Sequence, residues 1–174
     1  MSRVLIIAEA GVNHNGKLEI AKKLAQVAKE CGADIVKFQT AKLESLVSKC
    51  APMADYQKQN TGQEKSQKDM LEELLLSYDE FVELAKFCEE IGIKFLSTPF
   101  DIDSVKFLDS MQDMWKIPSG EITNYPYLLE IARTGKKIYL STGMSDIQEI
   151  GAAFELLQNN GVKDITLLHC TTEY

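Results

Sequence analysis

The sequence lacks any long hydrophobic run. No stretch approaches the roughly 20 consecutive apolar residues that a membrane-spanning helix needs, although 45% of the 174 residues are hydrophobic. The first residues, MSRVLIIAEAG, also lack the apolar core and cleavage site of a secretory signal peptide. We therefore expect a cytoplasmic protein with enough apolar residues to form one sizeable buried core.

Cysteine and positive charge are also scarce. The four cysteines contain no C-x-x-C pair, so neither a zinc ribbon nor a disulfide framework is indicated. The 26 acidic residues outnumber the 19 lysines and arginines, which gives a formal net charge of −7. Nucleic acids and anionic membranes attract positive surfaces, so we expect neither as a partner. A few local lysines would have to hold any anionic substrate.

Short runs rich in Val, Ile, Leu and Phe recur along the chain. They predict buried parallel strands, which form continuous apolar runs because both faces of the sheet are covered. The runs are residues 4–8, 35–39, 93–97, 115–117, 138–141 and 165–170. Between them lie helical patterns, and the first two have apolar stripes. The stripes consist of Ile20, Leu24, Val27 and Cys31, and of Phe81, Leu84, Ala85 and Cys88.

The turn residues support this division into strands and helices. A glycine stands between each of four helical patterns and the next strand, where a left-handed residue is favoured. These are Gly32, Gly92, Gly135 and Gly161. Two pairs have capping-box spacing at helix starts, and one proline suits a first helical position after Asn124 or Tyr125. They are Ser77 with Glu80, Ser145 with Gln148, and Pro126.

The alternation of strand and helix is the βαβ pattern of an α/β fold. It produces either a doubly wound sheet or a barrel, and periodicity does not distinguish the two. One interval, residues 41–76, is polar and irregular. A loop of this length inside a compact domain is usually a lid, a binding loop or disordered. We place it after the second strand, on the same face as the other strand-to-helix loops.

Polar residues follow the predicted strands. Parallel α/β folds bind ligands at the carboxyl ends of their strands, although a single Ser or Thr there is more often a turn former. Lys37 and Lys116 lie within apolar runs, where an ammonium group is costly unless an anion or a carboxylate meets it. Glu9 and Glu121 are placed similarly and could transfer protons. The pattern predicts an anionic substrate and proton transfer.

The two histidines raise the question of a metal site. His14 lies in a turn-like NHNG segment, where it could contact a substrate or cap a helix. His169 lies within the last apolar run, where a buried structural histidine is the more common case than a site residue. Two histidines are too few for a typical zinc site. We therefore expect no metal site made by this chain alone.

Six motifs in order resemble the bacterial sialic acid synthases, along the whole chain. They are 8-AEAGVNHNG-16, 35-IVKFQT-40, 97-STPFD-101, 116-KIPSGE-121, 141-STGM-144 and 168-LHCTTEY-174. The family condenses phosphoenolpyruvate with an N-acetylated amino sugar, with N-acetylmannosamine as the default, to give a sialic acid or a relative such as legionaminate or pseudaminate. The resemblance implies a TIM (β/α)₈-type barrel, with about six of the eight β/α units in residues 1–174.

The resemblance also implies roles for individual residues. Those matched to phosphoenolpyruvate are Lys37, Lys116, Ser119, Ser141 and Thr172. Those matched to the amino sugar, as the catalytic side, are Glu9, Glu121 and Tyr174, with Gln39 and Thr98 as supporting residues. It does not indicate which carboxylate moves the proton.

The family resemblance further implies a divalent metal, Mn²⁺ or Mg²⁺, that polarises the aldehyde of the sugar. Its histidine ligands would belong to later strands, and a C-terminal antifreeze-like domain would complete a homodimer. None of these parts is in the sequence. A whole barrel usually needs over about 200 residues, so we expect a truncated and catalytically incomplete part of the enzyme.

Two other functions stay open. Lys116 could form a Schiff base with substrate, as in pyruvate-dependent aldolases. The chain could also be a non-catalytic fragment that binds ligand without turnover, since an open arc of strands exposes two sheet edges.

Overall fold

The computed structural model of the chain describes residues 3–46 and 73–171. Within them the strands are β1 (Ile7–Gly11), β2 (Ile35–Thr40), β3 (Lys94–Pro99), β4 (Met114–Ile117), β5 (Lys137–Ser141) and β6 (Ile165–Leu168). They form two three-stranded sheets, β1-β2-β3 and β4-β5-β6, and every paired neighbour runs parallel. The α/β class and the parallel pairing predicted from the sequence are confirmed.

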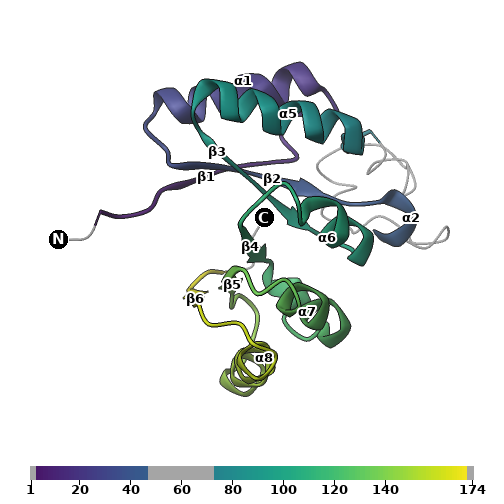
Figure 1. Cartoon of the computed structure of the whole chain (residues 1–174), viewed down its shortest axis with the longest axis vertical. Helices are drawn as coiled ribbons and strands as arrows, with labels where there is room; N and C mark the ends of the chain where they lie inside the picture. The colour runs from purple at the N-terminus through teal and green to yellow at the C-terminus, as the bar shows by residue number, and fades with distance from the viewer. Residues whose placement is uncertain (1–2, 47–72, 172–174) are drawn as a thin grey trace.

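Helices connect the strands. They are α1 (Leu18–Glu30), α2 (Leu43–Leu46), α5 (Tyr78–Ile91), α6 (Ile102–Leu108), α7 (Tyr125–Ala132) and α8 (Ile147–Asn159), with a 3₁₀ turn, η1, at Ser119–Glu121. Figure 1 shows α1 and α5 side by side over the first sheet, and α7 and α8 beside the second. Strand ends that carry polar residues therefore meet at one edge, as a βαβ succession requires.

The first strand begins later than the apolar run suggested. Residues 4–8 were expected to form it, but β1 spans Ile7–Gly11 and Val4 is 76% exposed. The reason is register, because Ile7 pairs with Ile35, the first residue of β2, and Ile6 before it accepts from the backbone N–H groups of Asp34 and Ile35 where that strand begins. Asp34 also accepts a hydrogen bond from the backbone N–H of Ile6.

The buried face of α1 also differs from the predicted stripe. The expected stripe included Ile20, Val27 and Cys31, yet all three are exposed, and the buried residues are Ala21, Ala25 and Ala28. Alanine lets a helix approach its neighbours closely. Leu24 of the predicted stripe is partly buried against the core, whereas Ile20 and Val27 turn outward. In α5 the prediction is confirmed for three residues, because Phe81, Leu84 and Cys88 are fully buried.

Most predicted helix boundaries are confirmed. Ser77 and Glu80 form the capping box of α5, and Gly92 ends that helix with φ 72°. The box predicted at Ser145 and Gln148 is wrong by one residue. Asp146 caps α8 and Glu149 completes that box, because a carboxylate in this position accepts the N–H of Glu149.

Asn124 is the N-cap residue of α7, and Pro126 follows Tyr125 as the second helical residue instead of the first. The positive φ predicted for the glycines after four helices is confirmed for Gly32, Gly92, Gly135 and Gly161. No described helix is long and apolar enough to cross a membrane.

Side chains join the two sheets at the boundary between β3 and β4. The amide of Gln112, which is buried, accepts from the backbone N–H of Ser97 at 2.8 Å and donates to its carbonyl at 3.1 Å. At the other end of β3, the hydroxyl of buried Tyr127 donates to the carbonyl of Pro99 at 2.7 Å. These bonds satisfy backbone groups of β3 that a neighbouring strand would otherwise satisfy.

Candidate functional site

An ion pair lies between the first two strands. Glu9 and Lys37 are register partners in β1 and β2, and the Lys37 ammonium contacts the Glu9 carboxylate. The Lys37 side chain is 9% exposed, whereas that of Glu9 is 50% exposed. Thr98, from β3, lies 3.5 Å from the Lys37 Nζ. The strand pairing predicted from the apolar runs thus brings three of the predicted site residues together.

A bulge follows Glu9 in β1 and determines how Gly11 lies beside the Glu9 and Gln39 side chains. The β1–β2 register shifts between Glu9 and Gly11, and Gly11 has φ +53°. A Cβ at Gly11 would stand 3.2 Å from Glu9 Oε1 and 3.6 Å from Gln39 Nε2, so both side-chain ends flank this glycine. Glycine is suited here both by its conformation and by the close approach of the two polar groups.

Lys116, on β4 in the second sheet, faces the same group of residues. Burial and, next, the charge of Lys37 lower its pKa from 10.5 to about 8, while Glu9 and Cys170 act in the opposite direction. The Glu9 carboxylate compensates part of this positive charge, and the two ammonium groups still repel each other beside it. An anion between them would relieve that repulsion.

Buried hydroxyl groups lie at the ends of the strands. Ser141 ends β5 and is 5% exposed, and Ser119 in η1 is 7% exposed. Thr40 and Ser97 share a hydrogen bond of 2.7 Å at the ends of β2 and β3. The prediction that polar residues gather at the carboxyl ends of the strands is confirmed in position, and the roles given to them remain predictions.

Glu121 is anchored by a residue that the sequence analysis treated only as a helix boundary. Its carboxylate Oε2 accepts a hydrogen bond of 2.6 Å from the side-chain Nδ2 of Asn124. Glu121 ends η1, and Asn124 caps α7 three residues later. In the sequence, this contact could have been inferred from the presence of an acidic residue three positions before the N-cap asparagine. Thr172 and Tyr174, also assigned to the site, lie outside the described residues, as does most of the 41–76 loop.

The histidines occupy different environments from those expected. His14 is fully buried, its Nδ1 accepts from the backbone N–H of Gly16 at 3.2 Å, and burial lowers its pKa. Its Nε2 has no hydrogen-bond partner within the described part of the chain. His169 is exposed, so its interpretation as a buried residue is wrong, because among the described strands β6 pairs with β5 alone.

The described residues also contain no group of three or more His, Cys, Asp and Glu side chains that could hold a metal ion. The acids of the site already have other partners, since Glu9 pairs with Lys37 and Glu121 with Asn124. These residues do not fit a metal centre.

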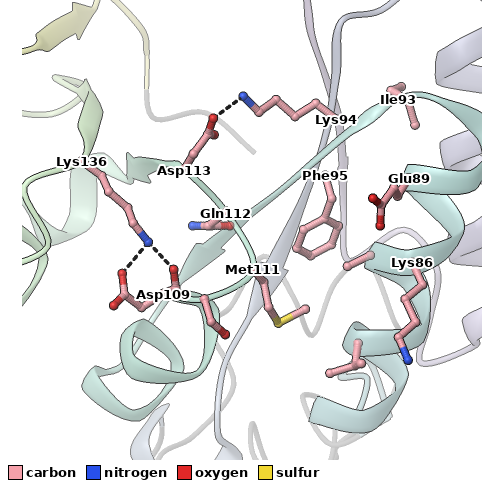
Figure 2. Close-up of a pocket in the computed structure, with 13 residues that line it drawn as sticks. Lys86, Glu89, Ile93, Lys94, Phe95, Asp109, Met111, Gln112, Asp113 and Lys136 are labelled. Atoms are coloured by element: carbon pink, nitrogen blue, oxygen red, sulfur yellow. Dashed lines mark hydrogen bonds and ion pairs between the residues drawn. The ribbon is translucent and has the colours of Figure 1, made fainter.

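A hollow lies at the opposite end of the strands, where β3, β4 and β5 begin. Its volume is about 750 Å³, and its lining includes Phe95 of β3, Met111 and part of α5. Figure 2 shows the ion pairs Lys94–Asp113 and Lys136–Asp109 at its rim. In these rim pairs each ammonium has its own carboxylate, whereas at the carboxyl ends the one carboxylate of Glu9 lies beside the two ammonium groups of Lys37 and Lys116. We therefore place the candidate site at the carboxyl ends of the strands.

Comparison with known proteins identifies relatives over nearly the whole chain. The model of the NeuB family matches residues 24–174. The chain is 51% identical to N,N'-diacetyllegionaminic acid synthase of Campylobacter jejuni, over all of this chain and 53% of that protein. It is 47% identical to N,N'-diacetyllegionaminic acid synthase of Legionella pneumophila, over 97% of this chain and 49% of that protein. The chain thus spans about half the length of these relatives.

A solved structure is also similar. The N-acetylneuraminic acid synthetase of Leptospira borgpetersenii, crystallised with citrate, superposes with a TM-score of 0.83 and 28% identity. The match covers 99% of this chain and 56% of that protein. The arrangement of strands and helices described above is therefore that of a known group of synthases.

Proposed function

The chain belongs to the NeuB family, and on that premise we propose that its protein joins phosphoenolpyruvate to an N-acetylated amino sugar. The products would be a sialic acid, or a close relative, and inorganic phosphate, which makes the protein a transferase that forms a C–C bond. The observation that carries the proposal is the convergence of Lys37 and Lys116 from two sheets beside Glu9. We further propose that the six strands are part of a TIM-type barrel.

The two lysines suit phosphoenolpyruvate because this substrate carries a phosphate and a carboxylate on one small molecule. Two fixed cations can hold both groups, and Ser119 and Ser141 can donate hydrogen bonds to them. Thr98 would support Lys37 from the neighbouring strand. The two lysines repel each other in the free protein, and an anion bound between them would be attracted to both ammonium groups. Its binding energy would therefore be largest at the point where the two lysines converge.

The amino sugar would lie on the side of Glu9 and Glu121. The enol carbon of phosphoenolpyruvate would attack the sugar aldehyde and form the C–C bond, which leaves a cationic centre that water captures before phosphate departs. A carboxylate beside this centre can take the proton from that water, and an acid can protonate the aldehyde oxygen. Gln39 stands beside Glu9 and is suited to a sugar hydroxyl. Tyr174 and Thr172 remain proposed members of the site.

A divalent cation, Mn²⁺ or Mg²⁺, is part of the proposal for the complete enzyme, where it would supply Lewis-acid polarisation of the aldehyde. A homodimer is proposed for the complete enzyme as well. The nature of the sugar is a narrower proposal. N-acetylmannosamine is the default, and the two relatives described above are named for a product with two acetamido groups, which makes a diacetamido sugar the competing substrate.

The proposal is tested by phosphate release. The full-length gene product is mixed with phosphoenolpyruvate, manganese and either N-acetylmannosamine or a 2,4-diacetamido sugar, and the 174-residue chain is assayed in parallel. Phosphate release that requires the amino sugar supports the synthase. If neither sugar caused phosphate release, the proposal would be contradicted. Phosphate release in the absence of any sugar would contradict it as well. Full turnover by the 174 residues alone would contradict the proposal that the metal ligands lie elsewhere.

The lowered pKa of Lys116 supports a second candidate function, that of a Schiff-base aldolase. A lysine with a pKa of about 8 is partly neutral near physiological pH and could attack a pyruvate carbonyl. Borohydride reduction in the presence of pyruvate would leave a covalent adduct on Lys116 in an aldolase. No adduct is expected for the synthase.

A further inference from the structure

Asn124 is placed to control the carboxylate of Glu121. Its Nδ2 donates to Glu121 Oε2 at 2.6 Å, and its backbone N–H donates to the carbonyl of Glu121 at 3.0 Å. We propose that Asn124 is a positioning residue that holds the Glu121 carboxylate toward the amino sugar. This inference rests on the function proposed above.

The hydrogen bonds of Asn124 determine which way its amide faces. Asn124 caps α7, and its Oδ1 accepts from the backbone N–H of Tyr127 at 3.4 Å. An N-cap side chain must present an acceptor to the first turn of the helix. The amide oxygen is therefore committed to α7, and the amide nitrogen must point away from it, toward Glu121. The backbone N–H of Tyr127 and the carboxylate of Glu121 together determine the orientation of the Asn124 amide.

The type of residue is informative as well. Serine and aspartate cap a helix as well as asparagine does, and the other caps that use side chains in the described helices are Ser77, Asp101 and Asp146. A serine can cap and also donate to a carboxylate, as Ser77 does to Glu80, but its hydroxyl is shorter than an amide, and an aspartate offers no donor. Asparagine at position 124 serves both contacts, since its amide oxygen accepts from α7 and its amide nitrogen donates to Glu121.

The contact matters because a glutamate side chain is flexible. Glu121 is half-buried and has three rotatable side-chain bonds, so an unanchored carboxylate would sample many positions. A reacting group is effective only when it is held close to its productive geometry. The bond to Asn124 removes much of that freedom before substrate arrives, and it ties the carboxylate to the rigid start of α7.

Two substitutions separate positioning from capping. Asn124→Ser keeps an acceptor for the helix and removes the amide donor. Asn124→Asp also keeps the acceptor, but it places a second negative charge beside Glu121. Asp146→Ser makes a matched exchange at the cap of α8, where no site residue is attached. All three variants of the full-length gene product are assayed for kcat and for KM toward each substrate.

We expect Asn124→Ser to lower kcat/KM for the amino sugar roughly 10- to 100-fold, the range for a hydrogen bond to a charged group. Asn124→Asp should lower it further. The KM for phosphoenolpyruvate and the melting temperature should stay near the wild-type values, and Asp146→Ser should leave all of these unchanged. Unaltered sugar kinetics in Asn124→Ser, or equal losses for both substrates, would overturn the proposal.

The crystal structure of Asn124→Ser provides a test that does not depend on activity. The Glu121 carboxylate should leave its present position while α7 still begins at Tyr125. A carboxylate that stays in place would refute the positioning role even if the wild type is active. Absence of turnover by the wild type with any amino sugar would instead refute the proposed function, and the displacement of Glu121 would still decide the role of Asn124.

Discussion

Lys37 and Lys116 come from different sheets, yet the charge of Lys37 is the second cause, after burial, of the lowered pKa of Lys116. The two residues are 79 positions apart in the sequence and meet because strand ends converge. Each lies in an apolar run, which is why both could be selected from the sequence. Their mutual repulsion, however, is visible only in three dimensions. This relationship gives the first prediction.

Phosphoenolpyruvate should bind more weakly as pH rises above about 8, because Lys116 then loses the proton that an anion needs. The dissociation constant should rise by up to about tenfold per pH unit, the limit for one linked proton. Calorimetric titration from about pH 7.5 to about pH 9.5 measures it. Lys116→Arg stays charged over this range and should show little pH dependence. An equal pH dependence in both proteins would exclude Lys116 as the titrating group.

Glu9→Gln should have opposite effects on stability and on anion binding. It leaves the buried ammonium of Lys37 without its counter-ion, which should destabilise the free protein by about 2 kcal/mol. The same change removes a competing negative charge, so phosphoenolpyruvate should bind several-fold more tightly. Denaturant unfolding and calorimetry measure the two effects.

Glu83→Gln is the control for Glu9→Gln. It removes one of the two exposed acidic partners of Lys22, the other being Glu19, and a pair of this kind contributes little to stability. Both measured quantities should stay close to the wild type. Weaker binding of phosphoenolpyruvate by Glu9→Gln would show that Glu9 helps to hold that substrate, contrary to its assignment to the sugar side.

Gln112→Leu should destabilise the protein with little effect on substrate KM values. The substitution leaves the buried N–H and carbonyl of Ser97 without the partners that Gln112 supplies, at a cost of roughly 1–3 kcal/mol for each group. Gln26→Leu on the surface of α1, where Gln26 bonds only to Glu30, should have a much smaller effect. Equal unfolding free energies for the two variants would show that the joint between β3 and β4 does not depend on Gln112.

Two Gly→Ala substitutions should shift stability in opposite directions. Gly16 has φ +65°, and a Cβ there would stand 2.4 Å from the carbonyl oxygen of Glu73. Gly16→Ala should therefore destabilise the protein by roughly 2 kcal/mol or more. Gly151 lies within α8 with open space around it, so Gly151→Ala should stabilise the protein by up to about 1 kcal/mol. Thermal unfolding measures both, and a stable Gly16→Ala would contradict the close packing of this loop.

The parallel α/β architecture could be predicted from the sequence because apolar runs are local signals, and strand-end polar residues supplied the candidates for the site in the same way. The errors arose where partners decide the outcome. The start of β1 depends on the first residue of β2, and the outward side of α1 depends on which stripe fits closely beside α5. His169 could be seen as exposed only once β6 was known to pair on one side.

In the candidate site, too, the residues were chosen from local sequence signals, whereas their contacts depend on the fold. Lys37 and Glu9 could be chosen from their positions in the chain, but their ion pair depends on the strand register. Asn124 was predicted as a helix boundary, which it is. For its second bond, to Glu121, the sequence offers only the three-residue spacing, and the direction of the amide group that makes the bond is visible only in the structure. Contacts of this kind depend on the orientation of side chains in three dimensions, which the order of residues along the chain does not specify.

The joint between β3 and β4 differs in kind from the ladders on either side of it. Backbone ladders are nearly indifferent to sequence, because every residue except proline brings the same donor and acceptor. At this joint two side chains, Gln112 and Tyr127, supply the bonds instead. Neither residue lies in a strand, so natural selection can adjust this part of the attachment without altering a strand, while the shared apolar core and the ion pairs Lys94–Asp113 and Lys136–Asp109 hold the two halves together as well.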